Sequence, residues 1–66
     1  MEIIVNGQSQ EVPTGYTAEQ LVNSLELAGK RIAMEVNAEI VPKSRYSHYA
    51  FTAGDCVEVV HAVGGG

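Results

Sequence analysis

The side chains best suited to chemistry in this sequence are two histidines and the hydroxyl groups beside one of them. His48 and His61 lack Cys, His or carboxylate neighbours at the spacing of a zinc site. Ser44 and Ser47 precede His48 in "KSRYSHY", but nucleophilic catalysis also needs an oriented base and an oxyanion site within a cavity. We therefore expect no metal site and no catalytic constellation, and we predict that the chain is not an enzyme.

The single cysteine is a further reactive group, but its setting favours a structural role. Cys56 cannot form an intramolecular disulfide, and it lies within the apolar run "DCVEVV". Free cysteine is among the most frequently buried residue types. We predict that Cys56 is mostly buried and contributes only to packing.

The final segment, "HAVGGG", offers a different kind of chemistry. Three glycines extend by roughly 10 Å, at about 3.3 to 3.6 Å per residue, and pass through a channel too narrow for a Cβ atom. A terminal carboxylate is ionised at neutral pH and can attack an activated phosphate. We predict that residues 64–66 form a flexible tail that enters the active site of another protein.

Length and composition limit the classes of protein to consider. A chain of 66 residues makes one domain, and its hydrophobic content of 45% is ordinary for a folded one. Eight acidic and four basic residues give a net charge of -4, which disfavours nucleic acid and favours a basic protein surface as partner. The apolar runs are too short to span a membrane, and the start lacks the features of a signal peptide, so we expect a cytoplasmic protein.

The first half of the chain predicts a hairpin followed by one helix. Asn6-Gly7 suits a type I′ turn between strands at residues 2–5 and 8–12. Thr17 and Gln20 form a capping-box pattern at the start of an amphipathic helix of about eleven residues, which Gly29 is expected to end.

The second half predicts three further strands. Residues 32–36 alternate between apolar and polar side chains, and a turn at Asn37-Ala38 leads to the short strand 39–41. Residues 43–52 are expected to form a loop with one helical turn, whose aromatic side chains cover one end of the core. Residues 56–63 form the last strand.

One helix covers only one face of such a sheet, so the other face is left to solvent or to a partner. Ile4 and Val60 project from this open face, and with Ala62 they are our candidates for partner docking. The predicted core consists of apolar residues from the helix and the opposite face: Ile3, Val5, Leu21, Val22, Leu25, Ile32, Met34, Val36, Val57 and Val59.

Several stretches, taken together, resemble the ThiS sulfur-carrier family of thiamin biosynthesis. They are the opening "MEIIVNG", the central "MEVNAEIVP" and the end "GDCVEVVHAVGGG", and the likeness covers the whole length. The resemblance implies an α+β fold of the β-grasp, ubiquitin-like type, with a mixed sheet of four to five strands and one helix packed on one face. It also implies parallel first and last strands at the centre of the sheet. Residues 1–63 would form this domain.

The resemblance further implies a function for the glycine end. In this family an E1-like adenylating enzyme of the ThiF type uses ATP to adenylate the terminal carboxylate, here that of Gly66. Sulfur derived from cysteine then displaces AMP and leaves a thiocarboxylate, which thiazole synthase of the ThiG type uses to build the thiazole. Gly66 is thus the sulfur acceptor, while Gly65 and, with less weight, Gly64 thread the partners' active sites. No cofactor is bound by the carrier itself.

Two alternatives remain open at the level of sequence. The first is a carrier for another pathway, such as the molybdopterin-synthase small subunit or a ubiquitin-related modifier, which share the fold and the diglycine end. The second is a non-catalytic β-grasp interaction module whose glycine end is inert.

Overall fold

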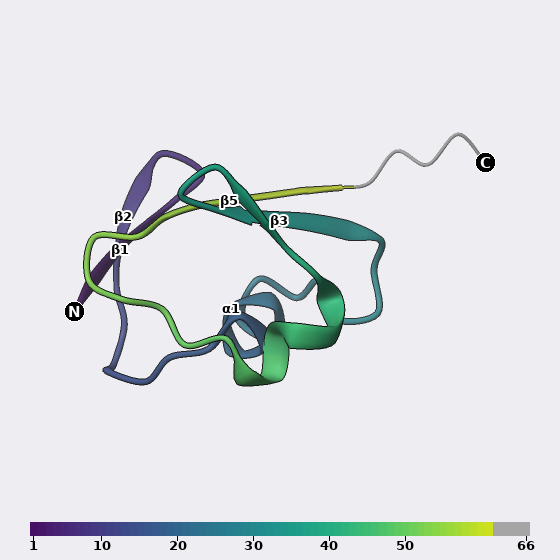
Figure 1. The fold of residues 1–66 in the computed structure, drawn as a ribbon, viewed down its shortest axis with the longest axis horizontal. Helices are drawn as coiled ribbons and strands as arrows, with labels where there is room; N and C mark the ends of the chain where they lie inside the picture. The colour runs from purple at the N-terminus through teal and green to yellow at the C-terminus, as the bar shows by residue number, and fades with distance from the viewer. Residues whose placement is uncertain (62–66) are drawn as a thin grey trace.

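A computed structural model describes residues 1–61, in which a five-stranded mixed sheet carries two helices on one side (Figure 1). The predicted α+β class and the single α-helix are confirmed. The predicted domain boundary at residue 63 lies outside the described residues. In chain order the elements are β1 (Glu2–Val5), β2 (Gln8–Glu11), α1 (Ala18–Ser24), β3 (Ile32–Val36), β4 (Glu39–Val41), the 3-10 helix η1 (Lys43–His48) and β5 (Cys56–His61).

The first hairpin forms where the sequence predicts it. Asn6 and Gly7 adopt φ angles of 50° and 82°, so both central turn residues lie in the left-handed region that a type I′ turn requires. The turn sets the register, in which Val5 pairs with Gln8. The second strand is one residue shorter than predicted, although Val12 still donates a 2.8 Å hydrogen bond to the Met1 carbonyl.

The start of α1 also agrees with the prediction. The Gln20 amide donates to the Thr17 hydroxyl at 3.2 Å, and the Thr17 amide donates to the Gln20 side chain at 2.9 Å. This reciprocal pair is the predicted capping box, and it satisfies two amides that the first helical turn leaves without partners.

The end of α1 differs from the prediction, because the helix has seven residues rather than about eleven. Glu26 takes a left-handed φ of 59°, and its amide and that of Leu27 donate back to Asn23 and Val22 at 3.0 and 2.9 Å. These two hydrogen bonds are a Schellman motif, which terminates a helix. Gly29 as the helix stop was therefore wrong; its own φ of 78° belongs to the turn that follows.

The sheet order is β2-β1-β5-β3-β4, with β1 and β5 parallel and the other neighbours antiparallel. The predicted parallel pairing of the first and last strands is confirmed. The turn between β3 and β4 places Asn37 and Ala38 at φ angles of 52° and 69°. β5 is therefore the central strand, paired with β1 near its start and with β3 along its length.

The core lies between the sheet and the helices. Leu25 and Ile32, predicted to be core residues, are only partly buried. Leu25 is the C-cap of a short helix, and Ile32 is the first residue of β3. η1 confirms the predicted helical turn and buries Tyr46, while Phe51 packs edge-on against Tyr49 at 5.7 Å between ring centroids. The buried apolar residues are Ile3, Val5, Val12, Ala18, Leu21, Val22, Met34, Val36, Val41, Tyr46, Phe51, Val57 and Val59.

Within residues 1–61, no helix is long and apolar enough to cross a membrane.

Candidate functional site

β5 is the element that leads to the glycine end. Its last described residue, His61, pairs with Ile32 of β3, so the strand is held by the sheet up to this point. The predicted sulfur acceptor Gly66, the threading residues Gly65 and Gly64, and the docking residue Ala62 lie outside the described residues. The described part of the site is therefore the anchor of that end and the open face of the sheet beside it.

Asn6, in the first type I′ turn, fixes β5 through a pair of side-chain hydrogen bonds. Its Oδ1 accepts from the Val59 amide at 2.9 Å, and its Nδ2 donates to the Val59 carbonyl at 3.2 Å. The side chain thereby replaces the main-chain partner that β1 would offer if it continued past Val5. The parallel ladder between β1 and β5 is thus extended toward the end of β5.

Asn37, in the second turn, fixes the beginning of β5 in the same way. Its Oδ1 accepts from the Cys56 amide at 3.0 Å, and its Nδ2 donates to Asp55 Oδ1 at 3.0 Å. Asp55 is only 8% exposed, and its Oδ2 accepts from the Thr52 amide at 2.8 Å. Buried polar groups are stable only when they have hydrogen-bond partners, and both carboxylate oxygens of Asp55 have a donor. Two asparagines therefore hold the two ends of the central strand.

The open face follows from the side-chain alternation of the strands. Val57 and Val59 of β5 are buried, so Cys56, Glu58 and Val60 point to the opposite side. Val60 is 56% exposed, and Ile4 is half-buried. The prediction that Ile4 and Val60 project from the open face is confirmed.

These two docking candidates do not touch each other across the strands. Ile4 is the register partner of Cys56, whereas Val60 lies four residues farther along β5, opposite Ala33. At about 3.3 Å per residue the two positions are roughly 13 Å apart. Glu58 lies between them, so the face has two apolar points separated by charge rather than one continuous patch.

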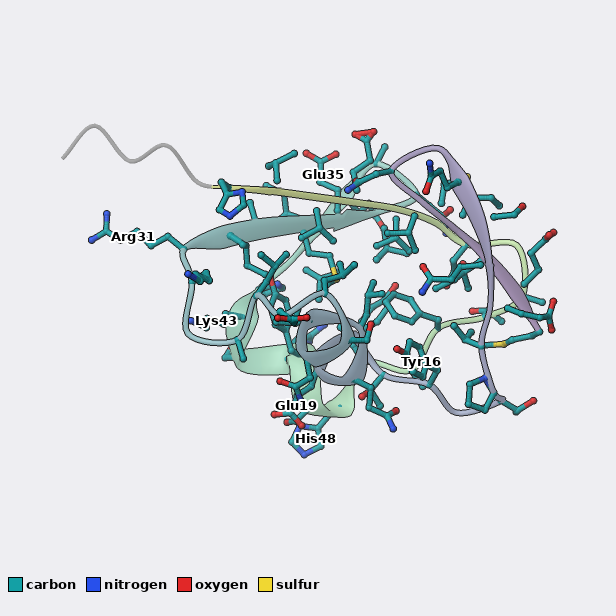
Figure 2. All side chains as sticks on the ribbon, turned by 180° about the vertical axis from the view of Figure 1, so that it is seen from behind. Tyr16, Glu19, Arg31, Glu35, Lys43 and His48 are labelled. Carbon is teal, nitrogen blue, oxygen red and sulfur yellow. The ribbon has the colours of Figure 1, made fainter. Side chains whose placement is uncertain are left out.

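Opposed carboxylates occupy the middle of this face. Glu35 and Glu58 are direct register partners on β3 and β5, and both are exposed. Glu35 points away from α1 (Figure 2). Ile40, which is 73% exposed, is the register partner of Glu35 on the next strand. Sequence alternation already placed Glu35 on this side; the register, which sequence does not give, shows which residues it faces.

A second carboxylate pair on the same face provides a contrast. Glu2 and Glu11 are register partners on β1 and β2, and the amino group of Met1 lies 3.2 Å from Glu11. Among residues 1–61 this is the one ion pair, so Glu35 and Glu58 have no such cation. Like charges placed directly opposite each other destabilise a sheet. Within residues 1–61, the centre of the open face therefore carries two opposed carboxylates that have no ion-pair partner.

Cys56 lies on the same face, which corrects a prediction. Its side chain is exposed rather than buried, because it directly precedes the inward-facing Val57 in a strand of period two. The apolar character of the run "DCVEVV" was misleading, since only alternate residues of this strand enter the core. Cys56 pairs in register with Ile4 and borders the apolar point that Ile4 forms.

Ser44, Ser47 and His48 lie on η1, away from this face, whereas His61 is the last residue of β5. The Ser47 hydroxyl is 3.0 Å from Nδ1 of His48, and both side chains are exposed on η1. Within the described residues, no group of three or more His, Cys, Asp and Glu side chains is arranged to hold a metal ion.

The topology of the sheet defines the class of protein. A five-stranded mixed sheet with a parallel β1–β5 pair at its centre and one α-helix across one face is a β-grasp, ubiquitin-like domain. A model of the ThiS family matches residues 3–66, and the chain belongs to this family.

Individual relatives agree with this assignment. The chain is 40% identical over 50 residues to the sulfur carrier protein ThiS of Bacillus subtilis. These 50 residues make up 76% of each of the two chains. It superposes on the crystal structure of a thiamine biosynthesis protein (ThiS) from Geobacter metallireducens with a TM-score of 0.84, at 26% identity and full coverage of both chains. It is also 38% identical over 66 residues to a thiazole synthase of Paramagnetospirillum magneticum, but spans only 20% of that protein.

Proposed function

We propose that this chain is a sulfur carrier for thiamin biosynthesis and that Gly66 bears the sulfur as a C-terminal thiocarboxylate. The observation that supports the proposal most directly is the family match over residues 3–66, because it includes the glycine end as well as the folded domain. The Bacillus subtilis relative is named as a sulfur carrier. In this function the chain is a co-substrate of other enzymes and does not itself catalyse a reaction.

The chemistry requires activation of the carboxylate by a partner. The Gly66 carboxylate attacks the α-phosphate of ATP in an E1-like enzyme of the ThiF type, which forms an acyl-adenylate and releases pyrophosphate. Sulfur derived from cysteine, at the oxidation level of sulfide, then attacks the acyl carbon, AMP leaves with the activated oxygen, and loss of the proton on sulfur gives the thiocarboxylate. Activation is necessary because a carboxylate resists a nucleophile until one oxygen becomes part of a good leaving group.

The thiocarboxylate is then consumed in the synthesis of the thiazole. We propose thiazole synthase of the ThiG type as the acceptor, and the likeness to a protein named thiazole synthase supports this partner. The nucleophile here is the sulfur on Gly66, so the synthase must also receive the glycine end.

The open face supplies the docking surface in this proposal. Glu35 and Glu58 lack a cation among residues 1–61, and Val60 and Ile40 are the large apolar side chains most exposed beside them. This composition fits a partner surface with basic side chains at its centre and apolar residues around them. Val60 lies next to the C-terminal end of β5, so a partner that docks there is close to the glycine end of the chain.

Intact-mass spectrometry tests the proposal. The chain is incubated with the activating enzyme, ATP and a sulfur donor, and the carrier function predicts a gain equal to the mass difference between sulfur and oxygen. Because the chemistry needs a free carboxylate on Gly66, the mass of the untreated chain is measured first. An unchanged mass after treatment contradicts the carrier function, and transfer to thiazole synthase distinguishes thiamin from another carrier pathway.

A substitution at Gly65 tests the threading of the glycine end. Gly65→Phe adds a side chain that a channel shaped for bare backbone excludes, so we expect adenylate formation to be lost. Gly64→Ala is the milder comparison, with a smaller expected loss. Circular dichroism shows whether the domain remains folded, and normal adenylation of Gly65→Phe would refute the threading argument.

A further inference from the structure

A groove on the helix side of the sheet is not used by the proposed sulfur transfer. It has a volume of about 210 Å³ and lies between α1, the turn that follows α1, the start of β3 and η1. Val60 and Glu35 lie on the opposite side of the sheet. Figure 2 shows Glu19 and Lys43, which line the groove, below the sheet and Glu35 above it. The two surfaces can be occupied at the same time.

The interior of the groove is lined by apolar side chains from all four segments. Val22 comes from α1, Leu27 from the turn, Ile32 from β3 and Tyr46 from η1. The Schellman motif explains part of this arrangement, since it returns Leu27 toward Val22 through the 2.9 Å hydrogen bond between their backbones. Leu27 and Ile32 are partly buried, so the groove leaves apolar area that a ligand can cover.

The charged residues at the groove are mostly basic. Lys30 and Lys43 line it together with one carboxylate, that of Glu19, and among residues 1–61 neither lysine lies within ion-pair distance of a carboxylate. All four basic residues of this chain fall between positions 30 and 45, although its net charge is -4. Figure 2 shows Arg31 and Lys43 on the same side of the molecule. Two of the four basic residues of this acidic protein therefore line the same groove.

The size of the groove limits what it can bind. Sites for small molecules and cofactors typically have volumes of about 300 to 1,000 Å³, so this groove is too small for most of them and suits an inserted side chain. We propose that the groove binds an acidic segment of a partner protein, which inserts an apolar side chain between α1 and η1. Carboxylates on either side of the inserted residue then contact Lys30 and Lys43.

A peptide-binding experiment on the full chain tests this proposal. The probe is a fluorescein-labelled heptapeptide with a central Leu-Phe pair flanked by Asp and Glu, and a second peptide has Lys at the flanking positions. Fluorescence anisotropy gives the affinities, and we expect the acidic peptide to bind at least about tenfold more tightly than the basic one. Backbone amide NMR shifts should locate it at Val22, Leu27, Lys30 and Tyr46.

Charge reversals provide the matched comparison. Lys30→Glu with Lys43→Glu should weaken binding of the acidic peptide at least about tenfold. Arg31→Glu with Arg45→Glu makes the same change in net charge at two residues that do not line the groove, and it should change the affinity by less than about twofold. No binding of the acidic peptide, equal binding of the basic peptide, or NMR shifts confined to the open face would each overturn the proposal.

Discussion

The two faces of the sheet differ in what covers them and in what their residues contribute. On β3, Met34 is completely buried beneath the helices, while its neighbour Glu35 is exposed and faces Glu58. One strand thus supplies both a core residue and a residue of the open face. On the covered face, buried apolar side chains stabilise the fold. On the open face, opposed carboxylates weaken the sheet. The contrast shows that the covered face supplies the core, and it underlies the proposal that the open face is the docking surface for sulfur transfer.

The largest expected effect comes from the covered face. Met34→Ala removes a side chain with no exposed surface, and losses of about 2 to 5 kcal/mol accompany such truncations. Urea denaturation measures the free energy of unfolding. Glu35→Ala is the matched control on the same strand, and we expect it to change stability by less than about 0.5 kcal/mol. Equal losses for the two variants would contradict the division between the faces.

The next effect concerns the asparagine that fixes the start of β5. Asn37→Gly accommodates the φ of 52° but removes the bonds to Asp55 and Cys56. A buried group left without a partner costs about 1 to 3 kcal/mol, so we expect a loss in this range. Amide hydrogen exchange at Cys56 should also become faster. Unchanged stability and exchange would show that the network does not hold the strand.

A charge reversal on the open face should separate stability from recognition. Glu58→Lys turns the opposed pair into a cross-strand ion pair between Glu35 and the introduced lysine, which should raise the free energy of unfolding by about 0.2 to 1 kcal/mol. On the proposed docking through this face, the same change should lower kcat/KM for adenylation by the activating enzyme about tenfold, because a basic side chain of that enzyme would lose its acceptor. Glu19→Lys, on the helix side, is the control with an equal change in net charge. A Glu58→Lys variant that adenylates normally would argue against docking through this face.

The smallest expected effect is on how the free energy of unfolding depends on pH, through a tyrosine on the covered side of the sheet. Burial raises the pKa of Tyr46 above its usual value of 10.0. The unfolded chain therefore releases this proton more readily, so the associated stability is fully present below pH 10 and decreases as the pH rises through the raised pKa. Tyr46→Phe should flatten this decline in urea titrations between about pH 9 and 11. An unchanged decline would assign it to other groups.

Local features of the sequence predicted the elements whose causes are local. The Asn6-Gly7 turn and the capping box of Thr17 and Gln20 each depend on residues close together in the chain. The alternation of β3 likewise predicted which of its residues face the core. The fold type and the role of the glycine end were predicted from the resemblance to a family, and the family match confirms that resemblance.

The wrong predictions at Gly29 and Cys56 also have physical reasons. Gly29 was the expected helix stop because glycine favours a left-handed φ. Glu26, three residues earlier, adopts that conformation and ends the helix, and Leu27 after it packs against the core. Cys56 was expected to be buried because its neighbours are apolar, but the strand alternates around it. Composition indicated how much apolar surface was available, not which side of the strand each residue occupies.

The sequence by itself determined the turns, the helix start and the strand periodicity, because each depends on backbone preferences or side-chain types of neighbouring residues. Only the tertiary structure decided that Glu35 faces Glu58, that two asparagines hold β5, and that Lys30 and Lys43 border one groove. These features join segments distant in the chain. Their geometry follows from strand register and core packing, which no single stretch of sequence specifies.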